Sequence, residues 1–207
     1  MEIEKIVDYQ MDQNCYLVHE NKKGFLIDPG GYPEKIIGRV KKLQVELCAI
    51  LLTHGHYDHI CGTDVVLEEW NLPVYGSELC EKNAKSPILN VSSLFGEDFS
   101  LKCPVLPIAD GEEKSFAELP VTCISTPGHT DCSVCYRIGN VLFSGDTLFL
   151  RSVGRWDFPN GDLDALKHSL RDRLYQLPDE VLVFPGHGND TSIGYEKKFN
   201  LTIRNGD

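Results

Sequence analysis

The sequence lacks any apolar run that approaches the roughly 20 residues of a membrane-spanning helix. Its first ten residues, MEIEKIVDYQ, alternate charged and apolar side chains. They contain no basic segment followed by an apolar one, so no export signal is visible. We therefore expect a cytoplasmic protein that does not associate with membranes.

Basic residues are scarce. The chain has 20 Lys and Arg against 31 Asp and Glu, which gives a formal net charge of −11. Binding to nucleic acid or to anionic lipid depends on Lys and Arg contacts with phosphate. This charge balance disfavours both partners and favours a small-molecule partner.

A second CxxC pair is also missing. Eight cysteines are present, but only Cys132 and Cys135 form such a pair. A zinc ribbon needs two pairs. Without an export signal we expect a reducing compartment, and therefore eight free thiols.

The length of 207 residues favours one domain, spanning residues 1–207. The pattern predicts strands over 3–9, 14–20, 23–30, 46–53, 73–77, 104–110, 121–128, 133–146 and 180–188, with Gly139 and Asn140 as a hairpin turn inside the eighth. Helices are predicted over 33–43, 64–70 and 162–177, the last capped by Asp162, and 82–96 is predicted to be a long loop over the site. Composition and pattern alone indicate an α/β or α+β fold.

Residues of the metal-ligand type follow directly after four apolar strands. The four stretches are ILLTHGHYDH, CISTPGHT, VLFSGDT and VLVFPGHG. If these strand ends converge, they bring together His54, His56, Asp58, His59, His129, Asp146 and His187.

Seven ligands exceed the needs of one ion, because a catalytic zinc uses about three protein ligands and a water. Two divalent ions that share a carboxylate fit this number. Histidine with carboxylate suits Zn, and Fe or Mn are the alternatives.

These motifs resemble the metallo-β-lactamase superfamily, whose HxHxDH signature corresponds to HGHYDH at residues 54–59. The resemblance implies a four-layer αβ/βα sandwich. TPGHT, SGDTLF and PGHG are most similar to glyoxalase II-like hydrolases. By that resemblance, one metal is held by three histidines and a second by a mixed set, with Asp146 as the bridge. The first set is His54, His56 and His129, and the second is Asp58, His59 and His187.

The same resemblance assigns roles to residues around the ligands. Asp28 is expected to brace the ligand loop, and Arg155 lies near a position where glyoxalase II enzymes contact glutathione. Thr53 and Thr126 adjoin ligands in the sequence, and their hydroxyls are candidates for orienting them.

The chemistry of such a centre favours hydrolysis of a thioester or ester. Two cations that share a water lower its pKa, so that a bridging hydroxide is available as nucleophile. A thiolate, whose conjugate acid has a pKa near 8.5, departs with little proton donation. Asp58 is the candidate proton shuttle.

Two departures from relatives sharpen this expectation. Only 20 residues follow His187, too few for the C-terminal helical domain of full-length glyoxalase II enzymes, so the short glyoxalase II-like hydrolases are the better match. Asp146 stands where true β-lactamases usually carry Cys, which disfavours that activity. The alternative that stays open is a mono-iron persulfide dioxygenase, which GRWDFPNG at residues 154–161 also resembles.

Overall fold

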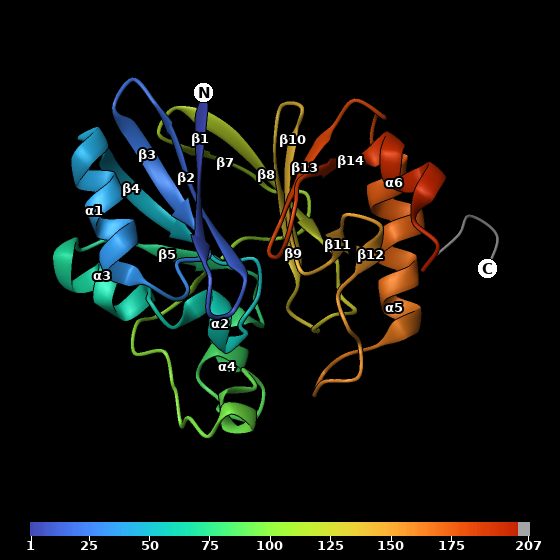
Figure 1. Ribbon diagram of the computed structural model, residues 1–207, viewed down its shortest axis with the longest axis horizontal. Helices are drawn as coiled ribbons and strands as arrows, with labels where there is room; N and C mark the ends of the chain where they lie inside the picture. Colours follow the sequence, from blue (N-terminus) through green and yellow to red (C-terminus); the bar gives the residue numbers. More distant parts are fainter. Residues whose placement is uncertain (203–207) are drawn as a thin grey trace.

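The computed structural model describes residues 1–202. Two six-stranded sheets lie face to face, with α1 and α3 outside the first sheet and α5 and α6 outside the second (Figure 1). This is the αβ/βα sandwich that the sequence predicted.

The first sheet has the order β1-β2-β3-β4-β5-β6, and the second has the order β14-β13-β10-β9-β8-β7. The strands of the first sheet are Glu2–Asp8, Gln13–Glu20, Lys23–Ile27, Glu46–Leu51, Val74–Gly76 and Leu106–Pro107. Those of the second, from β7 to β10 and then β13 and β14, are Glu113–Phe116, Leu119–Ser125, Val134–Ile138, Val141–Gly145, Leu182–Pro185 and Thr191–Ser192. A small ribbon joins β11 (Leu148–Phe149) to β12 (Ser152–Val153).

Three hydrophobic cores produce the four layers. Along β2, Leu17 packs in the core beneath α1 (Pro33–Leu43) and α3 (Thr63–Glu69), whereas Val18 packs in the core between the sheets. This is the alternation expected of a strand buried on both faces. The third core lies between the second sheet and α5 (Leu163–His168) and α6 (Ile193–Phe199).

Three predicted features of the helices and turns are confirmed. Asp162 caps α5, because its carboxylate accepts a hydrogen bond of 2.8 Å from the Ala165 backbone N–H. Gly139 and Asn140 form the two-residue connection between β9 and β10. The helix predicted over 33–43 is α1, with Pro33 in its first turn.

The prediction of a loop over 82–96 was wrong in part. The segment contains the end of α4 (Cys80–Ala84) and a 3-10 helix, η1 (Ser92–Phe95). Both are too short for a helical period to be visible. The predicted helix over 162–177 is not uniform either, because α5 continues as a π-helix over Ser169–Arg173 and a 3-10 turn over Leu174–Gln176.

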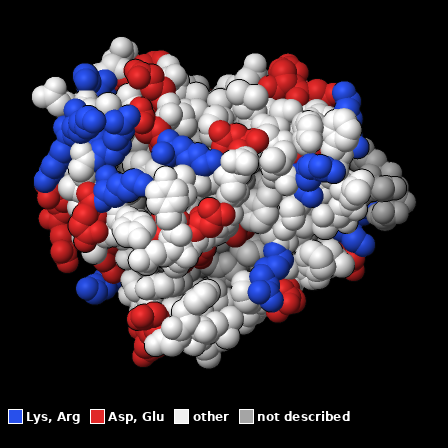
Figure 2. Space-filling view, viewed as in Figure 1, with Lys and Arg blue, Asp and Glu red and all other residues white. Residues whose placement is uncertain are grey.

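Several short elements escaped prediction. They are β7, β11, β12, β14, α6, and α2 (Tyr57–Ile60), which lies inside the HxHxDH stretch. All eight cysteines are free thiols, as expected. Across residues 1–202, no helix has the length and apolar character needed to cross a membrane. On the face in Figure 2, Lys and Arg gather over α1, and basic and acidic side chains are interspersed elsewhere.

Candidate metal centre

The four predicted strand ends meet at one edge of the sandwich. The segment after β4 contributes His54 and His56 and leads into α2, which carries Asp58 and His59. His129 lies between β8 and β9, Asp146 directly follows β10, and His187 follows β13. Parallel pairing of β10 with β13 places the last two strand ends side by side.

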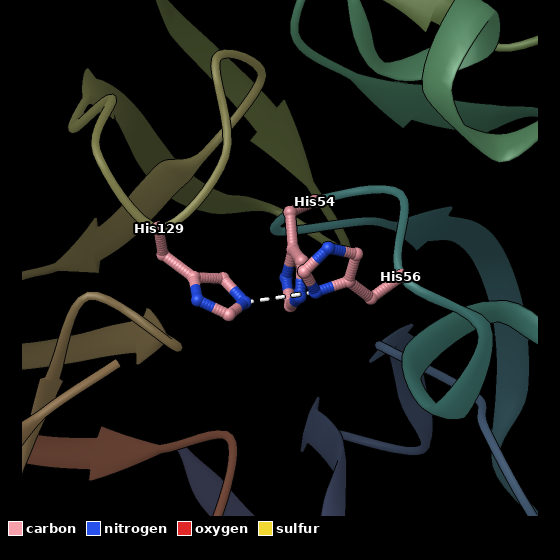
Figure 3. Close-up of side chains that lie close together, drawn as sticks. All are labelled: His54, His56 and His129. Atoms are coloured by element: carbon pink, nitrogen blue, oxygen red, sulfur yellow. Dashed lines mark hydrogen bonds between the residues drawn. The ribbon is translucent and has the colours of Figure 1, made fainter. Parts of the chain in front are cut away.

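Three histidines form the first group, called here the histidine cluster: His54, His56 and His129. Figure 3 shows their rings turned toward one another, His54 and His56 from one loop and His129 from the facing one. His129 Nε2 lies 2.8 Å from His56 Nδ1. All three side chains are buried, with at most 3% of the residue exposed.

The second group, called the mixed cluster, contains Asp58, His59 and His187. His187 Nε2 lies 3.1 Å from Asp58 Oδ2 and 3.3 Å from His59 Nε2. The side chains of Asp58 and His187 are 21% and 24% exposed, so this cluster is more exposed to solvent than the histidine cluster.

Asp146 lies between the two clusters. Its Oδ2 is 3.5 Å from His129 Nε2 and 3.5 Å from His187 Nε2, and its Oδ1 is 3.2 Å from His59 Nε2. Gly186 permits this arrangement, since a Cβ there would lie 2.3 Å from Asp146 Oδ1. One carboxylate therefore reaches ligands of both groups.

Hydrogen bonds at Nδ1 aim the opposite ring nitrogen of several histidines at the centre. His129 Nδ1 lies 2.7 Å from the Arg155 carbonyl, and His187 Nδ1 lies 2.9 Å from the Asp12 carbonyl. A carbonyl can only accept, so in each ring Nδ1 carries the proton and Nε2 is left with a lone pair in the neutral form. Such partners typically orient the imidazoles of metal sites.

Asp28 and Thr53 fix two more of the rings. Asp28 accepts hydrogen bonds from the Thr53 backbone N–H (2.7 Å), the Thr53 hydroxyl (2.6 Å) and His59 Nδ1 (2.8 Å). Because the Thr53 hydroxyl donates to Asp28, its oxygen can accept from His54 Nδ1 at 3.1 Å. One buried carboxylate thus connects a histidine of each cluster.

The two clusters differ in the pKa values of their imidazoles. Burial lowers the pKa of His54 and His129, and it lowers the pKa of His56 to about 3. Burial also opposes a charge on His59 and His187, but the neighbouring carboxylates, Asp146 foremost, raise the pKa of both. The histidine cluster is therefore neutral at pH 7, which is the form that ligates a metal.

These residues fit divalent metal ions. His54 Nε2 and His56 Nε2 are buried without a hydrogen-bond partner among the described residues, and a buried polar atom normally has one. Imidazole with carboxylate is the ligand chemistry of Zn, Fe and Mn sites.

A cavity of about 350 Å³ opens above the clusters. Phe158 lies edge-on to His56 with a ring-centroid distance of 5.6 Å, and Phe149 lies edge-on to His187 at 6.0 Å. Arg155 is the one Lys or Arg among the lining residues. Its guanidinium sits 3.9 Å from the Phe158 ring centroid and forms two hydrogen bonds with Asp157.

The surrounding residues that sequence reasoning selected fall into two kinds. Asp28, Thr53 and Arg155 contact the ligands or line the cavity. Among the described residues, no hydrogen bond joins the Thr126 hydroxyl to a candidate ligand, and it pairs instead with Thr147 at 2.9 Å. Sequence reasoning missed the carbonyls of Asp12 and Arg155, since a backbone group leaves no trace in residue type. It also missed the apolar lining residues Met11, Val91, Phe95 and Phe149.

Comparisons with known proteins agree with this geometry. A family model described as the metallo-beta-lactamase superfamily matches residues 9–187. Hydroxyacylglutathione hydrolase GloC from Haemophilus influenzae is 33% identical over 211 residues and covers 97% of each chain.

Solved structures are similar as well. BLEG-1, described as a B3 metallo-beta-lactamase, has a TM-score of 0.94 and 33% identity, covering 99% of this chain and 100% of that one. TTHA1623 in a di-iron-bound form has a TM-score of 0.86 and 34% identity, covering 97% and 100%. ETHE1 from Myxococcus xanthus has a TM-score of 0.83 and 30% identity, covering 98% and 84%. With its fold, its ligand clusters and these similarities, the chain belongs to the metallo-beta-lactamase superfamily, a superfamily of metal-dependent hydrolases.

Proposed function

We propose that this protein is a binuclear metal-dependent hydrolase of thioesters, similar to glyoxalase II. The observation that carries the proposal is the pair of ligand clusters with Asp146 between them. The histidine cluster would hold one divalent ion and the mixed cluster a second, Zn in the first instance, with Fe or Mn as alternatives. The similarity to GloC, a hydroxyacylglutathione hydrolase by name, supports the substrate class.

Bound metal ions would supply hydroxide at neutral pH, because they lower the pKa of a water they share. The protein's own contribution is to hold the ligands rigidly through Asp28, Thr53 and the Arg155 carbonyl. Asp58 lines the cavity, and its Oδ2 faces His187 Nε2 at 3.1 Å. In this proposal, that oxygen accepts a proton and returns it during turnover.

Arg155 is proposed to bind the substrate. Its side chain is 57% exposed at the cavity and presents a planar guanidinium, which recognises carboxylates. Its carbonyl holds His129, so a substitution that removes only the guanidinium leaves the ligand contact in place.

Hydrolysis of S-lactoylglutathione by the metal-loaded protein tests the proposal, with metal content measured on the same sample. We expect turnover with two metal equivalents, and its loss in His56→Ala. A protein that holds two metals but hydrolyses neither this nor any other thioester would refute the proposal.

A second candidate is the mono-iron persulfide dioxygenase, which the similarity to ETHE1 favours. The histidine cluster with Asp146 would suffice for one iron, and the mixed cluster would then hold no metal. One iron equivalent together with oxygen consumption on a persulfide would favour this candidate. The similarity to BLEG-1 makes a β-lactam the further substrate to include, although Asp146 in place of Cys disfavours it.

A further inference from the structure

The cavity above the clusters has an apolar character that hydrolysis alone does not require. Its floor is formed by ligands of both clusters and Asp146. The walls include five apolar side chains: Met11, Val91, Phe95, Phe149 and Phe158. A cavity of about 350 Å³ is of the size that takes a small molecule.

Val91 is the most constrained of these residues. It has φ 59 and ψ 9, in the left-handed region, and is only 3% exposed. A β-branched residue rarely adopts this conformation. Strain of this kind persists only where the surrounding structure imposes it, and it gathers at functional sites.

Asn90 imposes the conformation. Its side-chain amide donates to the carbonyls of Ala84 (3.1 Å) and Phe99 (2.9 Å), and its Oδ1 accepts from the Ser92 N–H. Its backbone carbonyl accepts a 2.9 Å hydrogen bond from the N–H of Tyr57, which stands between His56 and Asp58 in the chain. The segment that carries Val91 is therefore fastened directly to the metal-ligand motif.

A thioester would place two parts in this cavity, an acyl part and a thiol part. Charge distinguishes them. The thiol part can carry carboxylates, as in glutathione, and Arg155 is the one Lys or Arg among the lining residues. The acyl part needs no such neighbour. Apart from Phe158, on which the Arg155 guanidinium stacks, the apolar walls are Met11, Val91, Phe95 and Phe149.

We infer that the substrate is a thioester of a short apolar acyl group, and that Val91 limits the length of that group. The inference rests on the proposed thioesterase function and adds the class of acyl group. The reacting carbonyl and its α-position lie at the polar floor, so the apolar walls meet the acyl chain beyond the α-carbon. A polar group there would be buried against carbon, which costs binding.

The test compares acyl thioesters of one uncharged thiol, N-acetylcysteamine, with the metal-loaded protein. We expect kcat/KM to be about tenfold higher for butyryl than for 3-hydroxybutyryl, which differs by one hydroxyl beyond the α-carbon. Each methylene that still fits should add about fourfold. A profile in which 3-hydroxybutyryl equals or exceeds butyryl would overturn the inference.

Variants of Val91 test its role. Val91→Gly removes the wall and adopts the left-handed conformation without strain, so the ratio of hexanoyl to butyryl turnover should rise about tenfold. Val91→Thr keeps the shape but adds a hydroxyl, and should narrow the preference for butyryl over 3-hydroxybutyryl. If each variant changes kcat/KM by the same factor for all substrates, Val91 does not set specificity.

Leu94 provides a matched control for the rim. Leu94 and Phe95 are neighbours in η1 and are both 64% exposed, but only Phe95 lines the cavity. Phe95→Ala should lower the preference for apolar acyl groups, and Leu94→Ala should not. If the protein hydrolyses thioesters but kcat/KM does not depend on the length of the acyl chain, this inference alone is overturned. If it hydrolyses no thioester, the proposed function is overturned and the inference with it.

Discussion

The histidine cluster and the mixed cluster share Asp146, yet they present different environments to a metal ion. The histidine cluster is buried and, with its pKa values lowered by burial, uncharged at pH 7. The mixed cluster contains Asp58, and Asp58 and His187 are partly exposed. We expect the first cluster to exchange its metal slowly and the second to exchange it faster.

Chelation should give the largest effect and tests this difference directly. Dialysis against a chelator should remove the metal of the mixed cluster first, because solvent reaches Asp58 and His187. Activity should fall to background once the first equivalent has left. Metal content and hydrolysis are followed together over time. Loss of both metals in a single phase would contradict the comparison.

His56→Ala should come next in size. It removes a ligand of the histidine cluster and leaves a buried space, so we expect kcat/KM to fall by about 10²-fold or more, as when a charge-stabilising group is lost from an active site. One metal equivalent should also be lost. His168→Ala is the control, because the His168 side chain is 69% exposed and pairs with Asp172, away from the clusters in α5. Equal losses in both variants would show that His56 has no special role.

Asp28→Asn sharpens the comparison further. Asp28 accepts a hydrogen bond directly from His59 of the mixed cluster, whereas its hydrogen-bonded link to His54 of the histidine cluster runs through the Thr53 hydroxyl. Loss of a partner that orients a ligand typically costs 10- to 100-fold in metal affinity. We expect the metal affinity of the mixed cluster to fall by about that factor, and the metal affinity of the histidine cluster to fall by less. The measurement is competitive metal binding, with Asp110→Asn, whose side chain is 47% exposed, as control. A uniform loss at both clusters would refute this ordering.

Arg155→Met should have the smallest effect. The guanidinium is exposed and already paired with Asp157, so we expect KM to rise about fivefold for an anionic thioester of glutathione, with little change in kcat. A thioester of an uncharged thiol should be unaffected. Arg137→Met, on β9, is the control. A large fall in kcat would instead indicate that the substitution disturbs the Arg155 carbonyl and, through it, His129.

Long elements with a clear pattern were predictable from the sequence. Residues 33–43 have a helical period and a proline in the first turn, and they form α1. Strands buried on both faces, such as β4, read as continuous apolar runs. The short elements were not predictable, because α2, α4 and η1 span less than two helical turns and owe their conformation to tertiary contacts. The single domain, the cytoplasmic location and the roles of individual site residues stay predictions.

The site was predictable where residue type carries the chemistry. Histidines and aspartates directly after apolar strands indicated a metal centre, and Asp28 was recognised beside a strand end. Thr126 was selected for its proximity in sequence to His129, but its hydroxyl pairs with Thr147. Thr126 and His129 lie in the connection between β8 and β9, where the direction of each side chain depends on the local turn and not on nearness in the sequence.

The sequence by itself determined the family, the inventory of candidate ligands and the alternation that buries β2 in two cores, since each depends on residue type and order alone. Only the tertiary structure decided which ligands meet, that Asp146 lies between the clusters, and that Val91 stands over them in a left-handed conformation. The reason is physical. These features depend on backbone carbonyls, strand pairing and side-chain amides from distant segments, such as Arg155 against His129, and no local pattern encodes them.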